Sequence, residues 1–177
     1  VDSTRGGSLA SSQAVAGDAE EDEEWLEKGV KLRQKGDHAG ALRAFAQAHY
    51  LKPSGRTLGQ IGLERQSLHE WKLSANALAV ALGTSHEWVV KNRKHLEGAL
   101  EAAKSHIGRL LVTGPAGSQL YVDGIGAGNL PLEPIQIDEG EHVARVEKTG
   151  MKTWSTTVMI AGGTTTEARA LLEPDVP

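Results

Sequence analysis

The hydrophobic period of this chain changes once, near Gly108, and that change most constrains the fold. From Glu21 to Ser105, apolar residues recur at intervals of three and four, which is the period of an amphipathic helix. After Gly108, apolar and polar residues alternate in short runs that glycines and prolines separate, as in half-buried strands. We therefore expect an α+β multidomain chain in which a helical solenoid precedes a small antiparallel β-sandwich.

The helical region contains two helix pairs that are related by a shift of 33 residues. Under this shift Gly29 falls on Gly62, and Phe45 falls on Leu78. Small residues thus recur at positions where helices cross closely, and large apolar residues recur between them. We expect the second pair to occupy 57–67 and 70–82.

These residues resemble the tetratricopeptide repeat (TPR). The first pair supplies nearly the whole pattern of that family: Trp25, Gly29, Leu32, Ala41, Phe45, Ala48 and Pro53. The second pair is looser and lacks the final proline: Leu58, Gly62, Ser74, Leu78 and Ala81. An unrelated helical bundle is the alternative.

The TPR resemblance implies a groove, lined by the first helix of each pair, that holds a partner protein. The groove positions that it implies are Leu26, Val30, Arg33, Gln34, Gln60, Leu63, Gln66 and Ser67. One subfamily binds chain-terminal carboxylates with Lys, Asn and Arg at such positions, and this sequence lacks that set.

A third helix is expected from about Ser85 to His106, as a cap on the open end of the two pairs. Its polar side carries a basic run, which we interpret as a solvated face or as a face for an acidic partner: Lys91, Arg93 and Lys94. Nucleic acid is disfavoured because no aromatic residues are interleaved with this run.

The β region resembles the PEGA domain, a small β-sandwich of bacterial proteins. The name-giving motif is degenerate here, reading Pro-Ala-Gly-Ser at 115–118. The likeness continues through Tyr-Val-Asp-Gly at 121–124, Gly128, Leu-Pro-Leu at 130–132, Gly140 with His142, and Gly150. We expect five or six strands, with 124–131 as a turn-rich connection rather than a phosphate-binding loop, because no helix follows its glycines.

Charge and composition divide the chain at the same places. Residues 1–24 carry one Arg and seven acids, 25–108 carry 13 basic residues and seven acids, and 109–177 carry five and nine, so the net charges are −6, +6 and −4. We expect a disordered Ser/Gly-rich and acidic tail at 1–20, a TPR-like domain at 21–107, a PEGA-like sandwich at 108–174 and a short tail at 175–177.

No pattern in the sequence indicates catalysis. The chain has no cysteine, its seven histidines show no metal-ligand spacing, and no nucleophile elbow is present. The longest apolar run, Ala77 to Leu82, is far shorter than the roughly 20 residues that span a bilayer. We expect no enzyme activity, no cofactor, no metal and no transmembrane segment.

The sequence therefore favours a non-enzymatic interaction or scaffold protein. The two resemblances together imply a bacterial envelope-associated TPR–PEGA protein that is extracytoplasmic rather than cytoplasmic. Its groove would bind components of an envelope complex, and its PEGA domain would serve as a docking or spacer unit. One alternative is an accessory or sensor arm of a larger signalling, enzyme or transport system. Another is a carbohydrate-binding β-domain, for which only Tyr121 and Trp154 offer aromatic rings in the sandwich.

Overall fold

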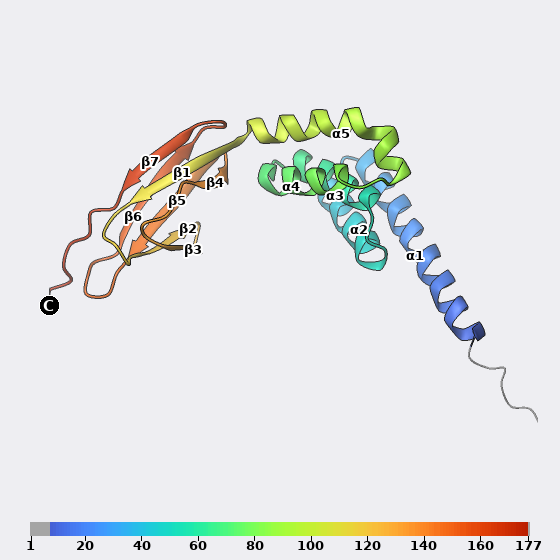
Figure 1. Ribbon diagram of the computed structural model, residues 1–177, viewed down its shortest axis with the longest axis horizontal. Helices are drawn as coiled ribbons and strands as arrows, with labels where there is room; N and C mark the ends of the chain where they lie inside the picture. Colours follow the sequence, from blue (N-terminus) through green and yellow to red (C-terminus); the bar gives the residue numbers. More distant parts are fainter. Residues whose placement is uncertain (1–7, 177) are drawn as a thin grey trace, which may run out of the picture. The chain divides into compact units, whose positions relative to one another are not determined.

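The computed structural model describes the backbone of residues 8–176 and the side chains of residues 21–176. The chain forms two compact units that divide at Glu101, a helical unit and a β unit (Figure 1). The α+β class predicted from the sequence is confirmed. The helices are α1 Ser8–Gln34, α2 His38–Leu51, α3 Gly55–Ser67, α4 Trp71–Leu82 and α5 Glu87–Ser105.

The helical unit consists of two helix pairs followed by α5 (Figure 1). Helix α1 packs on α2, α3 packs on α4, and α2 joins the pairs by packing on α3. Local signals set the helix starts. Asp37 caps α2 by accepting the Gly40 N–H at 2.8 Å, and Ser54 caps α3 by accepting the Thr57 N–H at 3.1 Å.

The 33-residue shift has a packing cause, because each pair contains one glycine against one large buried side chain. A Cβ atom at Gly29 would lie 2.5 Å from Cε1 of Phe45. A Cβ atom at Gly62 would lie 2.7 Å from Cγ of Leu78. Phe45 and Leu78 are both fully buried, so the two pairs make the same close crossing with different large residues.

The structure and the composition differ over the N-terminal stretch. Residues 8–20, for which the composition predicts a tail, belong to α1. The stretch contains no proline and has four alanines, so it can extend the packed part of α1 without a break. Residues 1–7 of the predicted tail, and Pro177, lie outside the described residues.

The β unit is a sandwich of two open sheets. Its strands are β1 Ile107–Thr113, β2 Gln119–Val122, β3 Ile125–Asn129, β4 Ile135–Asp138, β5 Gly140–Glu147, β6 Trp154–Ile160 and β7 Thr165–Arg169. One sheet has the order β4-β1-β7 and the other β3-β2-β5-β6 (Figure 1). Both sheets supply the core, for example Leu110 from β1, Leu120 from β2 and Val146 from β5.

Two features of the β unit depart from the sequence prediction. The turn-rich stretch 124–131 contains a strand, β3, which forms a sheet edge by pairing with β2 across a register shift between Leu120 and Tyr121. The sandwich is not wholly antiparallel either, because β1 and β7 run parallel, from Arg109 opposite Thr165 to Thr113 opposite Arg169. Five connecting strands separate this pair along the chain, so local alternation could not show it.

Candidate functional site

The apolar residues predicted to line the groove form part of the helical core instead. Leu26 is only 3% exposed and belongs to the cluster around Phe45, and Val30 packs against the same cluster. Leu63 packs against the cluster around Leu78. These three side chains therefore hold the helices together and offer little surface to a partner.

Arg33, another predicted groove residue, binds a buried carboxylate. Glu64 on α3 is 1% exposed, and Arg33 Nε donates to its Oε1. His38 Nδ1, at the start of α2, lies 2.8 Å from Glu64 Oε2. The Arg33 guanidinium also lies 4.9 Å from the centre of the Phe45 ring. One carboxylate thus ties α1, α2 and α3 together.

A second polar bridge joins α1 and α3 further toward the start of α1. Arg56 Nη1 donates to Glu23 Oε1 at 2.9 Å. Asp22 is 3% exposed, with its Oδ2 3.9 Å from Lys52 Nζ. Gln60, a predicted groove residue, is 6% exposed. Asp22 and Glu23 of the acidic run are therefore paired with basic residues of the helical unit, whereas Gln60 Oε1 and Asp22 Oδ1 are buried without a hydrogen-bond partner among the described residues.

An open pocket does lie further along, between α3 and α5. It has a volume of about 650 Å³, and its lining residues are Gln66, Lys91, Lys94, His95, Gly98 and Ala99. Gln66 donates from Nε2 to the Ala99 carbonyl at 3.1 Å, which fixes the amide against α5. A Cβ atom at Gly98 would meet nothing within 4 Å, so this side of α5 is uncovered. We call this the α3–α5 pocket.

The α3–α5 pocket unites one predicted groove residue with two residues of the predicted basic face. No acidic side chain lines it. Lys91 forms an exposed ion pair with Glu87 at 2.7 Å, which water weakens to a few tenths of a kcal/mol. Lys94 is exposed, and no carboxylate lies within ion-pair distance of it among residues 21–176.

The remaining predicted residues lie outside this pocket. Arg93 is directed elsewhere, because it donates to the Leu82 carbonyl at 3.3 Å and lies 3.7 Å from Glu97. Gln34 and Ser67 are exposed but do not line it. Sequence reasoning missed Glu64 and His95. Glu64 could have been found from its position four residues after Gln60, on the same face of the helix. His95 could have been found from its position four residues after Lys91.

In the β unit, a polar cluster ties the β2–β3 turn to β5. Asp123, at a left-handed φ of 50°, accepts the Val143 N–H at 2.9 Å, and its Oδ2 lies 2.6 Å from His142 Nδ1. Nε2 of His142 lies 2.9 Å from the Asp138 carbonyl oxygen. Partial burial raises the pKa of Asp123, but the bonds from His142 and Val143 and the His142 charge outweigh it and lower the pKa overall.

Within residues 8–176, no helix is long and apolar enough to cross a membrane. In the described part of the chain, no group of three or more histidine and acidic side chains is placed so that it could hold a metal ion. The aromatic rings of the sandwich are largely covered: Arg145 lies 4.2 Å from the centre of the Tyr121 ring, and Trp154 packs against the core.

Comparison with known families decides the nature of the β unit, since the PEGA domain model matches residues 110–175. The β unit contains a PEGA domain. The match begins in β1 and runs past β7, so it covers both sheets of the sandwich and none of the helices. The TPR resemblance of α1–α4 has no such support. A search of curated proteins found no match to this chain.

Proposed function

We propose that this chain is a non-enzymatic interaction protein in which the α3–α5 pocket holds a segment of a partner protein. The observation that carries the proposal is the pocket itself, where Lys91 and Lys94 stand beside Gln66 with no acidic residue in the lining. Its charge favours an acidic partner segment, and such attraction weakens as salt increases.

We also propose that α1–α4 are two TPR-like repeats and that α5 takes the place of a capping helix. The equivalent glycine crossings, Gly29 on Phe45 and Gly62 on Leu78, support this reading. In a repeat array each unit contacts its neighbours, and the last helix needs a polar outer face. The surface of α5 has that character, with exposed Lys91, Arg93 and Glu97.

The PEGA domain is proposed to act as a docking or spacer unit in a bacterial cell-envelope assembly. PEGA domains occur in extracytoplasmic proteins, which favours the periplasm or envelope as the location. The two rings on which the carbohydrate-binding alternative depends are partly covered, because Arg145 lies over one face of Tyr121 and Trp154 is half-buried against the core. Sugar stacking needs a free ring face.

Affinity capture with charge-reversed variants tests the partner proposal. The full chain, Lys94→Glu and Arg93→Glu would each be immobilised and exposed to bacterial envelope extract, and the retained proteins would be quantified by mass spectrometry. Lys94 lines the pocket, whereas Arg93 lies on the same helix but outside it. We expect at least one acidic protein to be retained by the full chain and by Arg93→Glu, and to be lost with Lys94→Glu. Equal loss with both variants would reject the α3–α5 pocket as the binding site.

A further inference from the structure

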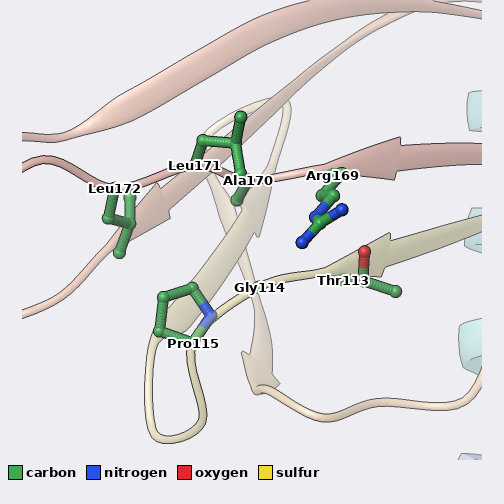
Figure 2. Close-up of a pocket in the computed structure, with 7 residues that line it drawn as sticks. All are labelled: Thr113, Gly114, Pro115, Arg169, Ala170, Leu171 and Leu172. Atoms are coloured by element: carbon green, nitrogen blue, oxygen red, sulfur yellow. The ribbon is translucent and has the colours of Figure 1, made fainter.

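A second pocket, of about 530 Å³, opens in the β unit where the parallel strands β1 and β7 part (Figure 2). Past Thr113 and Arg169, the Ala170 N–H still donates to the Thr113 carbonyl at 2.7 Å. Beyond that bond, one segment turns away at Gly114-Pro115 and the other continues through Leu171-Leu172, as Figure 2 shows. We call this wedge at the carboxyl ends of the two strands the strand-end pocket.

The strand-end pocket holds one cation and no anion. The Arg169 side chain extends from the end of β7 toward the Thr113–Gly114 segment (Figure 2). No acidic residue lines the pocket, and no carboxylate of residues 21–176 lies within ion-pair distance of the Arg169 guanidinium. A guanidinium presents several donors in one plane and matches the two oxygens of a carboxylate.

A main-chain donor adds to this cation. The Ala170 N–H faces β1 and bonds to Thr113, and the next N–H on the same side of this segment, that of Leu172, has no acceptor among residues 21–176 because the strands have separated. Leu172 lines the strand-end pocket. A main-chain N–H group beside a cation suits an anionic oxygen acceptor.

The strand-end pocket also has an apolar wall. Pro115 lies on one side and Leu172 on the other, and both are half-buried. Leu171, which follows β7, is 68% exposed. Gly114 is packed closely against Ala170, since a Cβ atom there would lie 3.1 Å from the Ala170 Cβ. The cation, the main-chain donor and the apolar wall therefore occupy one small pocket.

We propose that the strand-end pocket binds the C-terminal residue of a partner polypeptide. The terminal carboxylate lies against the Arg169 guanidinium and accepts from the free Leu172 N–H, and an aliphatic last side chain packs on Pro115 and Leu172. A chain terminus fits better than an internal acidic residue, because it carries the carboxylate and an aliphatic side chain on one Cα atom. This site is separate from the α3–α5 pocket, so either proposal can fail while the other stands.

Amide NMR of the full chain, titrated with two small probes, tests the site. N-acetyl-L-leucine carries the free carboxylate, and N-acetyl-L-leucinamide has the same side chain without the charge. With the acid we expect saturable shifts at the Gly114, Leu171 and Leu172 amides, and at least about tenfold weaker binding of the amide, since a hydrogen bond to a charged group contributes about 1.5–3 kcal/mol.

Two arginine variants separate the pocket from general positive charge. Arg169→Gln should reduce binding of the acid to the level of the amide probe. Arg109→Gln removes another exposed arginine, at the other end of the β1–β7 pair, and should leave binding of the acid unchanged. The spectrum of each variant also reports whether its β unit is folded. Equal binding of both probes, equal loss in both variants, or no saturable shift at these amides would overturn the proposal.

Discussion

Replacing Gly29 with alanine should destabilise the helical unit, although alanine is the better helix former. An added Cβ atom would lie 2.5 Å from the Phe45 ring, whereas nonbonded carbons pack at about 3.5–4.0 Å, so the ring must move by about 1 Å. Phe45 is fully buried, and overpacking of a core costs about 1–3 kcal/mol. A contact this short places the cost near 3 kcal/mol, and the gain in helix propensity offsets about 1 kcal/mol of it.

We therefore expect Gly29→Ala to lower the free energy of unfolding by about 2 kcal/mol. Gly98→Ala is the matched control, because it makes the same exchange in a helix where the new Cβ atom meets nothing within 4 Å. It should stabilise the unit by about 0.5–1 kcal/mol. Urea unfolding followed by far-UV circular dichroism measures both changes. If both alanines stabilise the chain to the same degree, Gly29 does not lie in close contact with Phe45.

Two further predictions concern buried and titrating carboxylates. Glu64→Gln keeps the side-chain size but removes the charge that Arg33 binds, so it should cost about 2 kcal/mol in urea unfolding, whereas Glu97→Gln, at an exposed pair, should change stability by less than about 0.5 kcal/mol. Comparable effects would show that Glu64 is not buried. The folded pKa of Asp123 lies below its ordinary value of 3.8, so its stabilisation is complete above that pH and is lost as the pH falls through the folded pKa. Below about pH 4, Asp123→Asn should therefore lose less stability per pH unit than the unchanged chain, as thermal melts of the β unit would measure, and parallel losses would contradict this assignment.

The helix pairs could be predicted closely because their determinants are local. Asp37 and Ser54 each cap a helix within three residues in sequence, and the glycine crossings repeat at a fixed spacing. The predicted second pair, 57–67 and 70–82, differs from α3 and α4 by two residues at most. Helix caps, turns and a repeated close crossing of two helices can all be recognised in a single sequence.

The features that were missed depend on distant partners. Strand β3 carries two glycines and reads as a turn, and it becomes a strand only because β2 lies beside it. The parallel pairing of β1 with β7 joins residues more than 50 positions apart. Glu64 resembles a solvated residue until Arg33 and His38 are brought to it by the packing of three helices.

The candidate site was also predicted only in part, because it too depends on how distant residues pack. The TPR resemblance placed eight residues in a groove, but only Gln66 lies in the α3–α5 pocket. Leu26 is buried in the helical core, and Arg33 donates to the buried Glu64. The basic run was predicted as one face, yet Lys91 and Lys94 enter the pocket and Arg93 does not.

Site-specific photo-crosslinking in the bacterial envelope would show whether the α3–α5 pocket contacts a partner protein. A photoreactive amino acid would replace His95, which lines the pocket, or Asn76, an exposed residue of α4 outside it. We expect a discrete protein to be crosslinked from position 95 and not from 76, and Lys94→Glu to abolish the product. Crosslinking of the same protein from both positions, or a product that persists with Lys94→Glu, would contradict this expectation.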